Sequence, residues 1–378
     1  MFVLKKLFAF SVLFAILISC TTTENDFFTI DVDSAKEQPL LLSGIAEKVE
    51  AIELEMTDNS LLKGSNSIER VICTEEYIIV FEFETIMLFD KTGKYIRQIG
   101  SKGQGPGEFL RITSATADLD NKLIYVYATE NKIICYDFTG RLIKEVSLEK
   151  RGILRHINYM NNNLLYLSRA QEKVDEASIF QTKLFTIDNN LLVSDSIEIR
   201  KEIDYLYQRV TLDNSAGGDY ICCDGVNTFL YNSYPVSETL LDTLYQLNDN
   251  RITPFLKLKF NDADYKNRVL TFDIQQPQKF FEELNRIMSI HKIYKSSRYV
   301  FSTYSYQENF YCFFYDIKTG EGYKDKDGYT DDIHTGEKVK IRPFNVNANM
   351  FYYLHTKIDD STLEEPNPTL YIGTLKKP

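Results

Sequence analysis

Apolar and polar residues alternate along most of the chain, and short turn motifs interrupt the alternation at intervals. The segments IMLFDKTGKYIRQI (86–99) and IICYDFTGRLIKEV (133–146) share one order: an alternating strand, Asp, two residues, Gly and a second alternating strand. Because Asp can hydrogen-bond the turn backbone and Gly accepts a positive φ, each segment predicts a β-hairpin. The 25 Tyr and 25 Phe residues also favour sheet over helix.

Three weaker copies of this hairpin follow, at 184–197, 244–256 and 313–323. The intervals between successive turns are 47, 51, 60 and 68 residues, counted at Asp90, Asp137, Asp188, Asn248 and Asp316. A β-propeller blade has four strands and a repeat of about 40 to 50 residues. The first two intervals therefore fit one blade each, and the later intervals fit a blade with an insertion.

The pattern predicts an all-β fold, a six-bladed β-propeller of four-stranded antiparallel blades. The segment VEAIELE (49–55) is a lone strand, and MFYYLHTKI and TLYIGTLKK near the C-terminus are strands short of a full blade. If the N-terminal strand joins the C-terminal strands, they form a sixth blade and the closed ring leaves no exposed sheet edge. A seventh blade is the alternative, if the 248–316 interval contains one more sheet.

One helical insertion is predicted at about 277–291, in QPQKFFEELNRIMSI. Its apolar residues fall near one face and follow Pro277, which suits the start of a helix. This face either packs on the rim of the propeller or docks a partner. Residues 20–45 are polar and irregular after the first cysteine and predict a tether that precedes a propeller domain at 46–378.

The glycine-rich segment IGSKGQGPGEFLRIT (99–113) could be a phosphate-binding loop or a connection between blades. Gly103, Gly105 and Gly107 are spaced G-x-G-x-G, Pro106 lacks a backbone donor, and an alternating strand follows instead of a helix. A nucleotide-binding loop needs the G-x-G-x-x-G spacing between a strand and a helix. We therefore expect a structural corner in which the glycines allow sharp turns and Glu108 accepts hydrogen bonds from backbone donors.

The N-terminus has the features of a secretory signal peptide at residues 1–19. Lys5 and Lys6 precede an apolar run of roughly 12 residues, which is too short to span a bilayer. The sequence that ends in Ser19-Cys20 resembles the lipobox of bacterial lipoproteins, although Ser19 stands where Gly or Ala is commonest. This resemblance implies lipidation of Cys20 and an outer-membrane lipoprotein on the periplasmic or the cell-surface side. A plain membrane anchor or a soluble secreted protein is the alternative.

The charge of the chain excludes nucleic acid as a partner. Removal of residues 1–19 takes away two of the 43 basic residues and no acid, so the mature charge is 41 − 54 = −13. An acidic chain without a basic stripe repels phosphate backbones. The cysteines show no CxxC spacing and mostly lie in apolar segments, so we expect buried free thiols.

The segment IGSKGQGPGEF, followed by LDNKLIYVYATENKIICYDFTGRLIKEV, resembles the NHL-type repeat and the six-bladed β-propeller lipoproteins of Bacteroidota. DTLYQLNDNRITPFLKLKF (242–260) is similar to a later part of the same group, and the resemblance covers most of residues 45–320. It implies the fold and a location in the cell envelope, and little about function. NHL repeats often carry Asp where this chain has Ala128, which weakens a metal-site hypothesis for that blade.

No spacing of catalytic or metal-binding residues stands out. The four histidines are far apart, and no HxH, HExxH or G-x-S-x-G motif occurs, so we expect no metal, no cofactor and no catalytic group. Cationic and tyrosine side chains in predicted loops and at strand ends could hold an anionic or sugar-like ligand. The candidates are Arg111, Arg155, His156, Arg209, Tyr231 and Tyr234.

These features predict a membrane-anchored, non-catalytic propeller that binds a small anionic or glycan ligand, or scaffolds a protein partner of the cell envelope. The alternative is a lyase or hydrolase with its site at the mouth of the channel, for which several His, Asp or Glu side chains would have to converge on the axis. A third hypothesis is a structural subunit that docks through the 277–291 helix.

Overall fold

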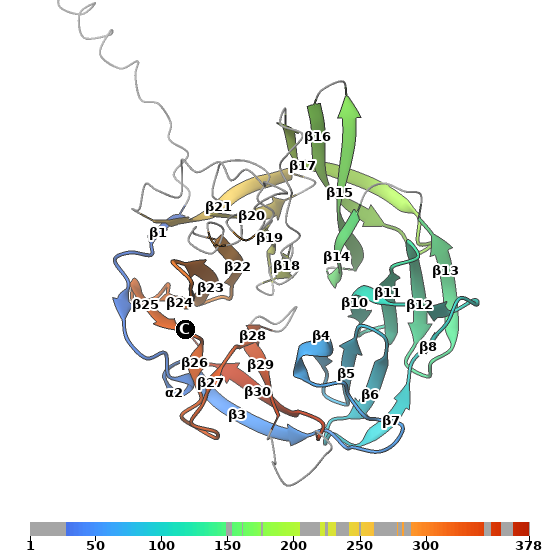
Figure 1. Ribbon diagram of the computed structural model, residues 1–378, viewed down its shortest axis with the longest axis horizontal. Coiled ribbons are helices and arrows are strands. Elements are labelled where there is room, and N and C mark those ends of the chain that lie inside the picture. Colours follow the sequence, from blue (N-terminus) through green and yellow to red (C-terminus); the bar gives the residue numbers. More distant parts are fainter. Residues whose placement is uncertain are drawn as a thin grey trace, which may run out of the picture.

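The computed structural model consists of β-sheets arranged around a central axis (Figure 1). Six four-stranded sheets form the blades of a propeller, and the first strand of each blade lies nearest the axis. The predicted all-β, six-bladed β-propeller is confirmed. The structure describes residues 28–148, 153–160, 162–174, 177–204, 220–223, 226–231, 242–248, 251–260, 278, 282, 289–343, 349–356 and 366–377.

The first three blades follow one another along the chain. Blade 1 consists of β4 (Ile68–Cys73), β5 (Tyr77–Glu82), β6 (Ile86–Asp90) and β7 (Tyr95–Gln98). Blade 2 consists of β10 (Ile112–Asp118), β11 (Leu123–Ala128), β12 (Lys132–Asp137) and β13 (Leu142–Ser147). Blade 3 consists of β14 (Ile153–Met160), β15 (Asn163–Val174), β16 (Ala177–Ile187) and β17 (Val193–Asp204).

The other three blades come from the C-terminal half of the chain, and the last of them also takes one N-terminal strand. Blade 4 consists of β18 (Tyr220–Cys223), β19 (Thr228–Tyr231), β20 (Thr243–Asn248) and β21 (Arg251–Lys259). Blade 5 consists of β22 (Ser289–Lys295), β23 (Tyr299–Tyr306), β24 (Asn309–Asp316) and β25 (Glu321–Lys326). Blade 6 consists of β28 (Arg342–Pro343), β29 (Met350–His355), β30 (Thr369–Leu375) and β3 (Ala46–Glu53). Short elements lie between blades: η1 (Ser65–Ser67), β8 (Ser101–Lys102), β9 (Glu108–Phe109), β26 (Tyr329–Thr330) and β27 (Lys338–Val339).

The ring closes where the two ends of the chain pair. β3 runs antiparallel to β30, with Val49 opposite Gly373. Gly373 has no side chain because the Phe351 ring occupies that space; a Cβ atom there would lie 2.1 Å from the ring. The predicted sixth blade, made from the N-terminal strand and the C-terminal strands, is thus confirmed.

Among the described residues the core is divided into six apolar clusters, and each cluster lies between two neighbouring blades. Between blades 1 and 2, for example, Phe81 and Leu88 pack with Val126 and Ile134. Blades 4 and 5 share one such cluster, which contains Phe229 and Phe313. Because these two blades touch, no seventh blade fits between them.

The predicted hairpin turns have the expected chemistry. In the first copy Asp90 Oδ1 accepts hydrogen bonds from the backbone amides of Thr92 (2.8 Å) and Lys94 (3.1 Å). Gly93 follows with φ at +90°. In the third copy Leu191 takes this left-handed position with φ at 60°, which explains why the glycine signature was missing there.

Residues 28–45 correct the prediction of an irregular tether. β1 (Phe28–Asp31) runs parallel to β21 as a fifth strand of blade 4, and β2 (Lys36–Glu37) does the same beside β25 of blade 5. The short helix α2 (Leu42–Ile45) then leads into β3. We call residues 28–41 the strap.

The strap orders because its apolar side chains find a core and its backbone finds unpaired sheet edges. Ile30 and Val32 are 2% and 0% exposed in the cluster between blades 4 and 5. The earlier part of the predicted tether, including Cys20, lies outside the described residues.

The predicted 277–291 helix falls mainly on residues outside the described part of the chain. Gln278 and Glu282 are helical, whereas residues 289–291 already belong to β22. Among the described residues, no helix has the length and apolar character needed to cross a bilayer. Cys135 and Cys312 are buried free thiols, as expected, and Cys73 is half-buried and also free.

Candidate functional site

The innermost strands of four blades share a β-bulge. Near the start of β4, β10, β14 and β22, the pairing with the second strand of the blade shifts by one residue. The shifts follow Ile68, Ile112, Leu154 and Ile290. A bulge bends its strand and redirects the side chains beside it, so polar residues after the bulge can point toward the axis although the strand is otherwise apolar.

Five side chains from four blades come together at the axis, and we call them the channel cluster. They are Glu69 and Arg70 on β4, His156 on β14, Lys292 on β22 and Arg342 on β28. The charge of Lys292, in blade 5, acts on Glu69 in blade 1 and on His156 in blade 3. Because such action falls off with distance, these side chains lie close enough for their charges to interact across the axis.

Hydrogen bonds to neighbouring blades hold the two guanidinium groups in place. Arg70 donates from Nη1 to the Ala115 carbonyl (2.9 Å) and from Nη2 to Asn158 Oδ1 (3.1 Å). This one side chain therefore connects blades 1, 2 and 3. Arg342 donates from Nη1 to the Ile68 carbonyl (3.0 Å), which connects blade 6 to blade 1.

Enclosure within the ring shifts the pKa values of the cluster. Burial raises the pKa of Glu69 to about 7, although the charges of Arg70, Arg342 and Lys292 oppose the shift. Burial, together with the Arg342 charge, lowers the pKa of Lys292 to about 8. Burial also lowers the pKa of His156 to about 3, with further contributions from Arg70 and Lys292.

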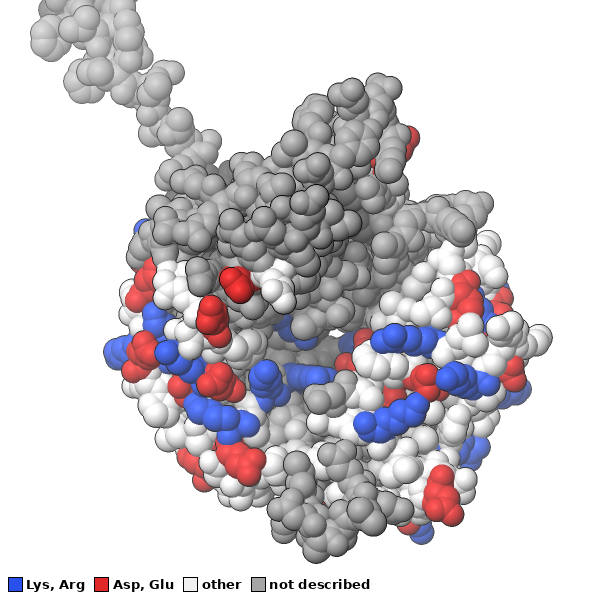
Figure 2. Space-filling view, in the orientation of Figure 1, with Lys and Arg blue, Asp and Glu red and all other residues white. Residues whose placement is uncertain are grey.

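At neutral pH the channel cluster has an excess of positive charge. The His156 imidazole is neutral, and the single carboxylate of Glu69 faces two guanidinium groups and the Lys292 ammonium. Figure 2 shows a hollow at the centre of the ring with Lys and Arg side chains gathered at its mouth. An enclosed group of cations in a low-dielectric wall attracts small anions and can bind them with charge-assisted hydrogen bonds.

The structure places the six predicted ligand contacts in different surroundings. His156 belongs to the channel cluster. Arg111 precedes β10, and its guanidinium lies 4.6 Å from the centre of the Phe83 ring. Tyr231 is 0% exposed and donates its hydroxyl to the Ile290 carbonyl (2.9 Å), so it joins blades 4 and 5 and is not a surface contact. The Arg155 side chain, Arg209 and Tyr234 lie outside the described part of the chain.

The sequence analysis missed Glu69, Arg70, Lys292 and Arg342. Each lies on the first strand of a blade, near its start. In an alternating strand, such residues look like ordinary solvent-facing positions. The pattern that could have revealed them is an apolar residue followed by two polar ones at the start of the strand, as in Ile68-Glu69-Arg70 and Ile290-His291-Lys292.

The glycine-rich segment connects blade 1 to blade 2. The Gly105 amide donates to Glu108 Oε2 (2.8 Å), and a Cβ atom on Gly103 would lie 2.1 Å from that same oxygen. Gly107 has φ at +70° and its amide donates to Glu145 Oε2 (2.7 Å) on β13. Acidic side chains therefore occupy the donors that an anion would need, and Pro106 offers none.

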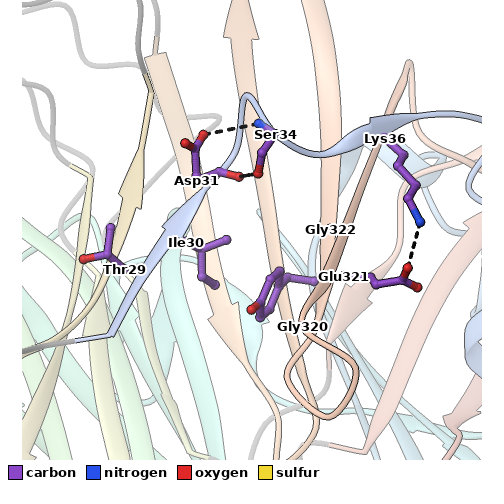
Figure 3. A pocket seen from close by; sticks show the side chains of 9 residues that line it. Thr29, Ile30, Asp31, Ser34, Lys36, Gly320, Glu321 and Gly322 are labelled. Atoms are coloured by element: carbon purple, nitrogen blue, oxygen red, sulfur yellow. Dashed lines mark hydrogen bonds and ion pairs between the residues drawn. The ribbon is translucent and has the colours of Figure 1, made fainter.

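A second hollow, of about 260 Å³, lies on the rim where the strap meets blade 5 (Figure 3). Its lining residues are Thr29, Ile30, Asp31, Ser34, Lys36, Tyr315, Gly320, Glu321 and Gly322. Its charged groups already have partners: Lys36 Nζ lies 2.7 Å from Glu321 Oε1, and Asp31 Oδ1 accepts a hydrogen bond from the Ser34 backbone amide. The channel cluster is therefore the better candidate for a binding site.

No group of three or more His, Cys, Asp or Glu residues is placed to hold a metal ion within the described part of the chain. In the channel cluster the metal-ligand types are Glu69 and His156 only, and three cations surround them. Positive neighbours disfavour a bound metal ion. The described side chains of the cluster thus fit an anion better than a cation.

Comparisons with known proteins place the chain in a family and support the fold. The model of the family described as Domain of unknown function (DUF4934) matches residues 27–376. The crystal structure of a Bacteroides fragilis protein described as exported has 16% identity and a TM-score of 0.61, and the match covers 93% of this chain and 99% of that one.

The WD40 domain of Neurospora crassa Pan2 has 9% identity and a TM-score of 0.38 over 82% of this chain and 76% of that one. No curated protein matches the sequence.

The raised pKa of Glu69 predicts a pH-dependent stability. Between its ordinary pKa of 4.5 and about 7, the folded protein keeps a proton that the unfolded chain has released. Stability from this group is therefore full below the ordinary value and is lost as the pH rises through about 7. The free energy of unfolding of the wild type should fall relative to Glu69→Gln by about 1–3 kcal/mol between about pH 5 and about pH 8.

Urea denaturation at both pH values measures this difference. Glu47→Gln, which changes an exposed carboxylate on β3, serves as the control and should follow the wild type. A wild type and a Glu69→Gln variant whose stabilities change in parallel would show that Glu69 is not enclosed.

Proposed function

Because the chain belongs to the family described as Domain of unknown function (DUF4934), and because its fold is a six-bladed β-propeller, we propose that it is an exported protein whose central channel binds a small anion. The observation that carries this proposal is the channel cluster, in which Arg70, Lys292 and Arg342 come from three blades and face one carboxylate. The protein holds its ligand and does not transform it.

The geometry favours a small anion over a large one. The mature chain carries a net charge of −13, while the axis is lined by cations. A polyanion would meet the acidic outer surface, whereas a small anion senses mainly the charges within about 8 Å at physiological ionic strength. A glycan ligand or a protein partner, both expected from the sequence, stays a prediction.

We further propose that the protein is an outer-membrane lipoprotein attached through Cys20. The lipobox-like sequence supports this, and the structurally similar Bacteroides fragilis protein is described as exported. Seven residues separate Cys20 from Phe28, the first residue of the strap. An extended chain covers at most about 3.3–3.6 Å per residue, so the rim of blade 4 would stay within roughly 30 Å of the lipid.

An enzyme with its site in the channel is the second candidate. Glu69 supports it, because a carboxyl with a pKa of about 7 is suited to general acid–base work. Lys292, with a pKa of about 8, could exchange a proton as its partner, whereas His156, with a pKa of about 3, stays neutral. Turnover of a glycan, lactone or peptide that Glu69→Gln abolishes would establish the enzyme instead.

Removal of one channel cation should weaken anion binding. For Lys292→Met, isothermal titration of the purified protein with acetate, glucuronate, inorganic phosphate and sulfate should show the affinity for every bound anion falling about tenfold or more, since a charged hydrogen bond is worth about 1.5–3 kcal/mol. Lys91→Met, which removes an exposed charge from the turn between β6 and β7, is the matched control and should bind as the wild type does. Equal losses in both variants, or none, would contradict a site in the channel.

The membrane anchor is tested by Cys20→Ser. Metabolic labelling with a radioactive fatty acid should mark the wild type and leave the variant unlabelled, because only the cysteine thiol can take the lipid. The wild type should also sediment with the membranes, while the variant should not. Labelled Cys20→Ser protein would rule out this anchor.

A further inference from the structure

One acidic and one basic group of the channel cluster have no hydrogen-bond partner among the described residues. The Oε2 atom of Glu69 is buried and accepts no hydrogen bond. The ammonium of Lys292 makes no hydrogen bond or ion pair there. Each is influenced by the charge of the other, so both lie within the same part of the channel.

The remaining cations of the cluster are already tied to the protein. Arg70 donates hydrogen bonds to the Ala115 carbonyl and to Asn158 Oδ1, and Arg342 donates one to the Ile68 carbonyl. Their charge and their remaining N–H groups still act on a ligand, and Lys292 is the cation of the cluster whose ammonium has no acceptor among the described residues. A ligand that satisfies this site must therefore accept a hydrogen bond from Lys292 and donate one to Glu69 Oε2.

We infer that the channel selects an oxyanion that carries its own proton, of which hydrogen phosphate is the simplest, and rejects an oxyanion without one, such as sulfate. This inference rests on the proposed anion-binding function. Both ions are tetrahedral and similar in size, and at the pH of the experiment below both are mainly dianions. Only hydrogen phosphate has an O–H group that can donate to the Glu69 carboxylate.

The physical reason is the cost of a buried acceptor without a donor. Sulfate would place its oxygen atoms against Glu69 Oε2 with no proton between them, so the carboxylate would stay unpaired and like charges would meet. A site built to hydrogen-bond a group rejects an analogue that lacks it far more strongly than an apolar pocket does. An O–H···O⁻ bond is also among the stronger hydrogen bonds.

The charged neighbours of Glu69 are Arg70, Arg342 and Lys292, and His156 stays neutral over the pH range of the experiment. Protonation turns the Glu69 carboxyl into a donor. Sulfate should then be accepted. Sulfate itself keeps the same charge over this range, so any change in its binding comes from the protein.

The test is isothermal titration of the purified protein with inorganic phosphate and with sulfate at about pH 7.5. We expect the wild type to bind phosphate about fourfold more tightly than sulfate, because roughly three quarters of the Glu69 carboxyls are ionised at this pH and must take up a proton before sulfate is accepted. In Glu69→Gln the amide can donate to sulfate and can still accept from phosphate, so the ratio should fall to about one. Glu47→Gln is the matched control and should keep the ratio of the wild type.

A second measurement follows the wild type itself, so its main result does not depend on whether a Glu69 variant folds. Between about pH 7.5 and about pH 5.5 the affinity of the wild type for sulfate should rise about fourfold from this group, because the protonated share of the Glu69 carboxyl rises from roughly a quarter to nearly all. Lys292 also gains charge in this range, and the rise in Glu69→Gln measures that contribution alone. The rise in the wild type should be the larger of the two.

The outcomes separate the two claims. If the wild type binds sulfate as tightly as phosphate, and Lys292→Met weakens both, the selectivity is wrong and the anion site stands. If neither anion binds to the wild type, the proposed function itself is contradicted. A wild type that prefers phosphate to the same degree as Glu69→Gln does would show that another group makes the selection.

Discussion

The pairing of β3 with β30 is the constraint on which the rest of the structure depends. Without β3 the last blade would have only three strands and an open outer edge. The face of blade 1 that packs against blade 6 would then be less completely covered. With β3, Leu54 and Leu370 join the cluster between blades 6 and 1. A closed ring leaves no long exposed edge and fixes every first strand at the axis. The position of Arg342 opposite Glu69 is a consequence of that closure.

The bulges convert this architecture into a site. Each inner strand is apolar where it packs between blades, so a regular strand would offer the channel few charged groups. The shift after Ile68 and the equivalent shift after Ile290 bring Arg70 and Lys292 toward a common space. Charges from different blades then share one enclosure, which raises the pKa of Glu69 and lowers that of Lys292. Side chains of other blades contribute to both pKa values: Lys292 and Arg342 to that of Glu69, and Arg342 and Glu69 to that of Lys292.

The sequence predicted the parts of the fold that depend on local chemistry. The Asp90 and Asp137 turns were readable because Asp and Gly act within a few residues. The strap could not be predicted in this way. The parallel pairing of Phe28–Asp31 depends on the sheet edge that β21 presents, and a short polar segment does not specify that edge. The channel cluster could not be predicted either, since its members are separated by up to 273 residues along the chain, between Glu69 and Arg342. Only the number and order of the blades bring them together.

The most direct test of the account is a crystal structure of the protein grown with arsenate, which carries a proton as phosphate does and scatters anomalously. The account predicts an anomalous peak in the channel, in contact with the Lys292 ammonium and with Glu69 Oε2. A channel without a peak, or a peak confined to the rim beside the strap, would contradict it.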